Sequence, residues 1–149
     1  MRELVIGAGA VGTKVAQQLL SSNAVDKILL RDIEPEKLGV ASKTLGSRVE
    51  VEHFPFPQNM DADVVVVASP RGTQLEAVKK AISLRRPTVV VSDGLSETVS
   101  ILNLEKEAFE LGVPVVVGTG FAPGLSCVLC AYGKTLLEQI SIGSCAGIF

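Results

Sequence analysis

Apolar runs and helically spaced apolar stripes alternate along this chain. Short runs rich in Val, Ile and Leu predict strands at residues 4–6, 27–31, 48–54, 64–68, 88–91 and 113–117. Between most of these runs, apolar residues recur at helical spacing, which predicts helices at residues 11–20, 36–45, 73–84, 97–111 and 124–137. This alternation predicts an α/β fold, a doubly wound parallel sheet of the Rossmann type with about six strands.

A glycine-rich loop joins the first expected strand to the first expected helix. Gly7, Gly9 and Gly12 form a Gly-x-Gly-x-x-Gly pattern, with Ala10 and Val11 inside it. In such a loop the first glycine permits a tight turn, the second lets a pyrophosphate approach the backbone, and the third lets helix and strand pack closely. The helix then offers unpaired N–H groups and positive partial charge to phosphates. The pattern and its position predict a dinucleotide site that includes all five residues.

An acidic residue ends the second expected strand, where this fold needs a group for the adenosine ribose. Asp32 lies twenty residues beyond Gly12. A carboxylate there accepts hydrogen bonds from the ribose hydroxyls and repels a 2′-phosphate, which favours NAD. Arg31 beside it could instead meet a 2′-phosphate, so NADP stays open. The competing interpretation is that Asp32 only stabilises the N-terminal end of the following helix.

Further candidate cofactor contacts lie at the carboxyl ends of the later strands. Right-handed crossovers and the position of the glycine loop favour the strand order 3-2-1-4-5-6. Ligands of open parallel sheets bind along the carboxyl edge of the strands. We therefore expect the nicotinamide half of the cofactor to lie across Ala68, Ser69 and Pro70 and towards Ser92 and Gly120.

Composition narrows the range of partners. The 149 residues carry a net charge of −2, and no basic cluster is longer than Arg85-Arg86, so nothing favours nucleic acid or an anionic membrane. The uncharged stretch 111–133 is broken by prolines and glycines, which argues against a membrane span. The N-terminus opens directly on a strand, without a signal peptide, and the cysteine count of three is odd. Both features favour a cytoplasmic location.

The C-terminal part of the sequence is more apolar than a single covering layer can bury. The expected helix 124–137 is apolar around nearly its whole circumference, so it needs cover on more than one side. Residues 140–149 alternate like a strand. We expect residues 1–139 to form a nucleotide-binding domain and residues 140–149 to begin a second, substrate domain that is absent. An element shared between the copies of a homodimer is the alternative.

Two cysteines form a Cys-x-x-Cys pattern near the start of that last helix, Cys127 and Cys130. A redox or zinc site needs a thioredoxin-like context or a second pair of ligands, and the sequence contains neither. We therefore expect both thiols to pack in the core and expect no metal site.

The segment after the sixth expected strand reads Gly120-Phe121-Ala122-Pro123-Gly124-Leu125-Ser126. It resembles the Gly-Phe-Asp-Pro-Gly-Leu/Met/Val-Ser/Thr segment of the saccharopine dehydrogenase family, which includes carboxynorspermidine synthase-like reductases. The nucleotide domain of that family begins with a similar glycine loop, so the resemblance covers nearly all of the chain. Ala122 departs from the pattern, because several members have Asp there, and this leaves the substrate open.

The resemblance implies an enzyme that reduces an imine between an amino acid or amine and a carbonyl compound, or oxidises the secondary amine. A nicotinamide cofactor would carry the hydride, and the second domain would supply most contacts to an amino-acid-like substrate and the acid/base groups. We therefore assign no catalytic residue to this chain. Two other interpretations fit the glycine loop: a nucleotide sensor without enzymatic activity, and the cofactor domain of a homoserine or aspartate dehydrogenase.

Overall fold

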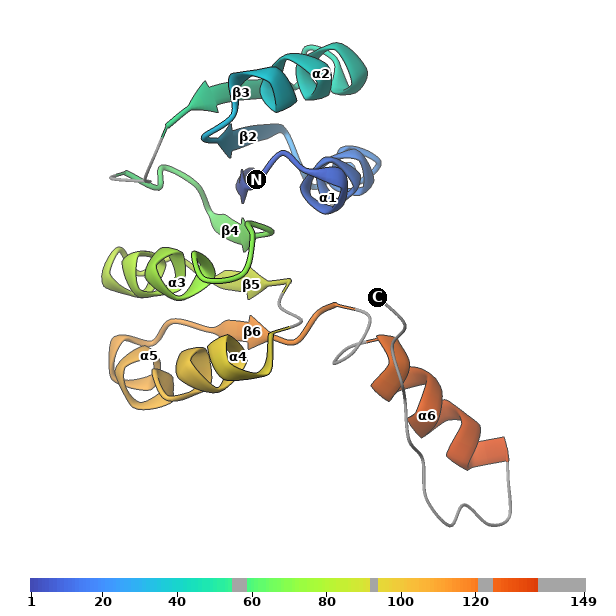
Figure 1. The fold of residues 1–149 in the computed structure, drawn as a ribbon, viewed down its shortest axis with the longest axis vertical. Helices are drawn as coiled ribbons and strands as arrows, with labels where there is room; N and C mark the ends of the chain where they lie inside the picture. The colour runs from blue at the N-terminus through green and yellow to red at the C-terminus, as the bar shows by residue number, and fades with distance from the viewer. Residues whose placement is uncertain (55–58, 92–93, 121–124, 137–149) are drawn as a thin grey trace.

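The strands of this computed structural model form a single six-stranded sheet (Figure 1). The structure describes residues 1–54, 59–91, 94–120 and 125–136. All paired strands run parallel in the order β3-β2-β1-β4-β5-β6, which confirms the predicted fold class and strand order. The strands are β1 (Arg2–Ile6), β2 (Lys27–Asp32), β3 (Val49–His53), β4 (Val64–Val67), β5 (Thr88–Val90) and β6 (Val115–Val117).

Six helices accompany these strands in the described residues. They are α1 (Ala10–Leu20), α2 (Pro35–Leu45), α3 (Gln74–Ser83), α4 (Leu95–Leu102), α5 (Glu105–Leu111) and α6 (Leu125–Leu136). The prediction of one continuous helix over 97–111 was wrong, because the chain turns at Asn103 and Leu104. The Leu104 N–H bonds the Ile101 carbonyl at 3.0 Å, a tight three-residue turn, and acidic residues in the first turn of α5 stabilise the new helix start.

Strand residues alternate between two separate cores, one on each face of the sheet. Val5 and Val66 pack with buried residues of α1 and α2. Leu4, Val65 and Val67 pack with buried residues of α3, α4 and α5 on the opposite face. Because β4 is covered on both faces, it is apolar throughout, with four consecutive valines.

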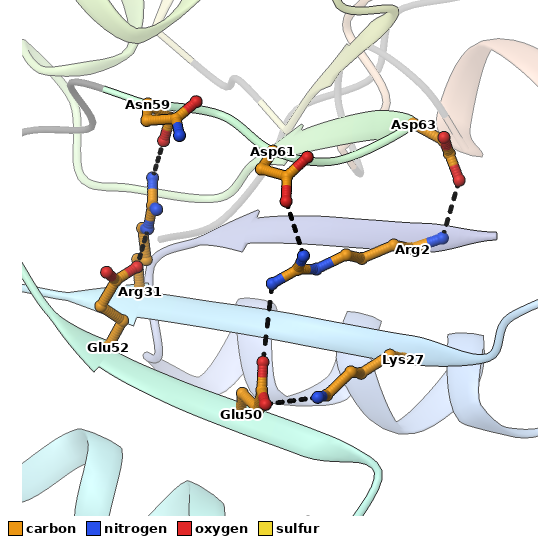
Figure 2. A network of polar contacts seen from close by, with 8 residues as sticks. All are labelled: Arg2, Lys27, Arg31, Glu50, Glu52, Asn59, Asp61 and Asp63. Carbon is orange, nitrogen blue, oxygen red and sulfur yellow. Dashed lines mark hydrogen bonds and ion pairs between the residues drawn. The ribbon is translucent and has the colours of Figure 1, made fainter.

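On the face of the sheet that α3 covers, the part over β1, β2 and β3 carries charged side chains (Figure 2). The described part of the β3-to-β4 crossover contains no helix, and polar residues line the sheet there. Arg2 pairs with Asp61 at 2.7 Å and with Glu50 at 3.6 Å, and Lys27 also pairs with Glu50. Because these side chains are substantially exposed, each pair contributes at most about 1 kcal/mol, so the ladder mainly keeps this face compatible with water.

Helix α6 points away from the sheet (Figure 1), and several of its apolar side chains are exposed. Leu125, Val128, Leu129 and Tyr132 are each more than half exposed. Cys127 and Cys130 are exposed as well, so the prediction that they pack in the core was wrong for the part of the chain described. The strand-like alternation predicted for 140–149 lies outside the described residues. Nowhere in the described ranges is a helix both long and apolar enough to cross a membrane.

Glu3 generates a prediction about pH-dependent stability. It lies in β1 and is 4% exposed. Burial raises the pKa of the Glu3 carboxyl, the Met1 amino group opposes this, and Asp63 adds to it. Ionised Glu3 therefore destabilises the fold, and the penalty grows as pH rises above the ordinary range of a glutamate. Glu3→Gln should raise Tm at neutral pH and leave it nearly unchanged below about pH 4.

Glu50→Gln is the matched control for thermal melts across this pH range. A hydrogen bond from Lys27 lowers the pKa of the Glu50 carboxyl, so its ionised form favours the fold and its loss brings no gain at neutral pH. If Glu3→Gln and the parent protein had the same Tm at neutral pH, the buried, ionised Glu3 would not destabilise the fold, and this prediction would be wrong.

Candidate functional site

The glycine loop is held by contacts that exclude side chains at two of its three glycines. Gly7 has φ +106°, and a Cβ on it would lie 2.5 Å from the carbonyl oxygen of Ala68. A Cβ on Gly12 would lie 1.8 Å from the carbonyl oxygen of Gly7. A Cβ on Gly9 would meet no atom within 4 Å. Gly7 and Gly12 thus serve packing, whereas Gly9 keeps open the space in front of α1.

The N-terminal end of α1 is free to receive an anion. Gly9 is its N-cap in an extended conformation, without a side-chain cap, and the first turn contains no acidic residue. The loop amides before it already have acceptors: the Gly7 N–H bonds the Arg31 carbonyl at 2.8 Å and the Ala8 N–H bonds Asp32 Oδ2 at 2.6 Å. The helix start therefore presents unpaired N–H groups and positive partial charge, which suit a phosphate.

Asp32 is the last residue of β2, and its carboxylate is hydrogen-bonded to the glycine loop. Its Oδ2 accepts the Ala8 N–H, and its Oδ1 accepts the Glu34 N–H at 2.9 Å. A carboxylate has about four acceptor positions, so two remain for other donors. Paired ribose hydroxyls supply donors of this kind next to a diphosphate.

A cleft of about 290 Å³ opens beside Asp32. One wall comes from the end of β2 and the start of α2, and the other comes from the segment that leads from β4 into α3. Its lining includes Asp32, Ile33, Glu34, Lys37, Phe54, Ser69, Pro70, Gly72, Thr73 and Glu76. The volume lies at the lower end of the range for ligand pockets, so it suits the nucleoside half of a dinucleotide.

The cations bordering this cleft have carboxylate partners. Arg31 borders it, but its guanidinium pairs with Glu52 and donates to the Asn59 carbonyl (Figure 2). Lys37 pairs with Glu34 at 2.5 Å, and this bond raises the pKa of Lys37. The cleft therefore does not offer a ligand an unpaired guanidinium from Arg31.

Four more of the residues predicted from the sequence are described, and they follow strands β4 and β6 at the same edge of the sheet. Ala68, Ser69 and Pro70 directly follow β4, and the Ala68 N–H bonds the Ile6 carbonyl at 2.8 Å beside the glycine loop. Gly120 follows β6, and its carbonyl accepts the Leu125 N–H at 2.9 Å. Ser92 lies outside the described residues, as does the segment 121–124.

Sequence reasoning missed much of the cleft wall. Ile33 and Gly72 lie in the loops after β2 and β4, and Lys37 and Glu76 lie in the first turns of α2 and α3. Only these positions near the carboxyl edge of the sheet could have indicated them. Thr73 was expected only as the beginning of a helix. No motif marks such residues, because the wall is defined by how two distant segments face each other.

A larger and more open hollow of about 1290 Å³ lies on the outer side of α1, towards α2. It includes Lys14, Gln18 and Arg48. Arg48 donates to the carbonyls of Leu20 and Val25, so its cation serves local structure. This hollow reaches the first turn of α1 at Ala10 and Val11, but it includes neither Asp32 nor the residues that follow β4.

The fold, the open start of α1 and the Asp32 carboxylate together define a dinucleotide-binding Rossmann domain. A family model described as NADP oxidoreductase, coenzyme F420-dependent, matches residues 4–94. The chain belongs to this family. The matched residues contain the glycine loop, Asp32 and β1 to β5, so NAD(P) is the cofactor class of the domain.

Solved structures of several dehydrogenases share this fold. Apo saccharopine dehydrogenase (L-Glu forming) from Saccharomyces cerevisiae has a TM-score of 0.71 at 19% identity, over 92% of this chain and 31% of that one. Apo scyllo-inositol dehydrogenase from Lactobacillus casei has a TM-score of 0.69 at 20% identity, over 91% of this chain and 40% of that one. GenD2 from gentamicin A biosynthesis, in complex with NAD, has a TM-score of 0.64 at 23% identity, over 79% of this chain and 34% of that one. This chain thus spans about a third of their lengths, and at these identities the likeness shows the fold alone.

The glycines generate a paired prediction. Gly9→Ala should leave Tm nearly unchanged, because the position is extended and open, but should weaken NADH binding by roughly tenfold or more, since the new methyl group occupies the space of the diphosphate. Gly12→Ala should destabilise the fold by about 3 kcal/mol or more, because its Cβ meets the Gly7 carbonyl. Thermal melts and NADH fluorescence titrations measure both effects. Full NADH affinity in Gly9→Ala would contradict the proposed place of the diphosphate.

Proposed function

We propose that this chain is the cofactor-binding part of an NAD(H)-dependent oxidoreductase that transfers a hydride at a C–N bond of an amino-acid-derived substrate. The observation that carries the proposal is the Asp32 carboxylate, which is bound to the glycine loop through the Ala8 N–H and borders the adjoining cleft. A diphosphate on the start of α1 would bring its ribose towards this carboxylate.

The charges around the cleft favour NAD over NADP. Asp32, Glu34 and Glu76 contribute carboxylates to its lining. Arg31 and Lys37 are already paired with Glu52 and Glu34. A 2′-phosphate would face Asp32 and would have to compete for cations that already have partners, which disfavours it. We therefore infer that the protein prefers NAD, although the family is described by NADP.

The C–N reaction is inferred from the segment after β6. Residues 120–126 resemble the corresponding segment of saccharopine dehydrogenases, and the described part of the chain has the fold of the yeast enzyme. We propose that residues 1–139 form the cofactor domain and that residues 140–149 open a second domain, which would hold the amino-acid-like substrate. The acid/base groups for the reaction would also come from that second domain.

The residues of this chain would bind and orient the cofactor. The N–H groups at Ala10, Val11 and Gly12 would hold the diphosphate, while Asp32 would fix the adenosine ribose. The ends of β4, β5 and β6 would support the other half, through residues 68–70, Ser92 and Gly120. When bound, the nicotinamide supplies the hydride chemistry.

Cofactor titration and a turnover assay test this proposal separately. Fluorescence titration of the chain with NADH, NADPH and ATP should show preferential NADH binding. The protein encoded by the complete gene should then oxidise NADH when an amino acid and a 2-oxo acid are mixed with it. Cofactor binding without turnover on such mixtures would favour a nucleotide sensor, and turnover only on homoserine or aspartate would favour those dehydrogenases. Failure to bind either nicotinamide cofactor would overturn the proposal at its base.

Asp32→Ala should weaken NADH binding by roughly ten- to a hundredfold, as expected for the loss of about 1.5–3 kcal/mol of charged hydrogen bonds. The affinity for NADPH should fall much less, because the repulsion of the 2′-phosphate is also removed. Isothermal titration with both cofactors measures the two effects.

Glu36→Gln is the matched control, because Glu36 lies in the first turn of α2 and does not line the cleft. It removes a carboxylate close to Asp32 in sequence and should leave both affinities unchanged. Unaltered NADH affinity in Asp32→Ala would contradict the proposed role of Asp32 in binding the ribose.

A further inference from the structure

The N-terminal end of α3 is capped by a carboxylate from a different helix. Glu97, in the first turn of α4, accepts the Gln74 N–H at 2.9 Å and the Leu75 N–H at 3.1 Å through Oε1. Its Oε2 accepts the Gly72 N–H at 2.8 Å. Thr73, the N-cap residue itself, makes no side-chain capping bond. A carboxylate 23 residues away in the chain thus does what a local cap usually does.

The Thr73 hydroxyl does not cap α3 and instead contacts the residues before it. Thr73 Oγ1 lies 2.9 Å from Ser69 Oγ and 2.8 Å from the Pro70 carbonyl oxygen, and the Thr73 N–H bonds the same carbonyl at 3.3 Å. The segment 69–73 is therefore folded onto itself as a compact turn.

A buried amide ties this turn to the neighbouring strand end. Gln74 is 2% exposed, and its Nε2 donates to the Ser69 carbonyl at 2.8 Å and to the Val91 carbonyl at 3.1 Å. These two carbonyls follow β4 and β5, whose ends lie along the edge that binds ligands in this fold. Gln74 thus connects two parts of the proposed cofactor crevice.

We propose that Glu97 and Gln74 are positioning residues for the cofactor. Together they clamp the segment 69–73, which forms the wall of the cleft opposite Asp32. Neither residue lines the cleft itself. Their bonds determine where the wall stands, and so how well a nucleoside fits between it and the ribose carboxylate. The inference rests on the proposed function of the cleft as a cofactor site.

The clamp also makes the N-terminal end of α3 different from that of α1. Glu97 fills the N-terminal end of α3 with a fixed negative charge, while α1 has neither a cap nor an acidic first-turn residue. A diphosphate is therefore attracted to α1 and finds α3 already neutralised.

Glu97→Gln is the main test, because it keeps the shape of the side chain and removes its charge. Its amide nitrogen cannot accept a hydrogen bond, so one of the two sets of N–H groups loses its acceptor. NADH binding should weaken by roughly five- to thirtyfold, as for a displaced binding wall. Amide exchange at Gly72, Gln74 and Leu75 should become faster in the same variant.

Two controls separate positioning from general destabilisation. Glu105→Gln removes a first-turn carboxylate from α5, away from the cleft, and should leave NADH affinity unchanged. Ile101→Val lowers stability through the core of α4 and should also leave affinity unchanged at temperatures well below its Tm. Gln74→Met tests the second half of the clamp, because it keeps the volume of the side chain and removes the amide, and should weaken NADH binding as well.

The outcomes distinguish the clamp from the proposed function. If the parent protein binds neither NADH nor NADPH, the cofactor assignment fails, and the clamp fails with it. If the parent protein binds NADH and Glu97→Gln binds it equally well despite faster exchange at Gly72, only the clamp is overturned. An affinity loss in Ile101→Val as large as in Glu97→Gln would also overturn it, because stability alone would then explain the effect.

Discussion

The structure depends on a contact in which backbone meets backbone without room for a side chain. The carbonyl of Gly7 lies where a Cβ on Gly12 would be, and Gly7 in turn lies against the carbonyl of Ala68. Three elements therefore meet at one point: the end of β1, the start of α1 and the end of β4. This contact directs α1 so that its N-terminal end faces the carboxyl edge of the sheet.

Two carboxylates then give the starts of α1 and α3 different roles. Glu97 reaches across from α4 and closes the N-terminal end of α3. Asp32 binds the Ala8 N–H and stands beside the N-terminal end of α1, which remains open. Of these two helix starts, only that of α1 remains free to attract an anion, and under the proposed function the attached sugar would meet the Asp32 carboxylate. The cap on α3 and the open end of α1 would then both direct a diphosphate to α1.

The sequence predicted the features that depend on local pattern. Short apolar runs indicated the strands, and right-handed crossovers together with the position of the glycine loop gave their order. The glycine loop also indicated the tight approach that Gly7 and Gly12 make. Helix ends were less predictable, since the turn at Asn103 interrupts a regular apolar stripe. The cap by Glu97 could not be predicted, because it joins residues that only tertiary packing brings together. The exposure of Cys127 was equally hidden, since an apolar pattern shows what needs cover and not whether this chain provides it.

Arg31 shows why adjacency in sequence misleads at the end of a strand. It precedes Asp32, and this proximity kept open the alternative that Arg31 would meet a 2′-phosphate of NADP. In a strand, however, neighbouring side chains point to opposite faces of the sheet. Arg31 shares its face with Leu29, on the α3 side, and there it joins the polar ladder through Glu52 (Figure 2). Asp32 turns to the glycine loop instead. A group that binds a 2′-phosphate next to Asp32 would therefore come from a position other than 31, and Lys37 of this cleft is already paired with Glu34.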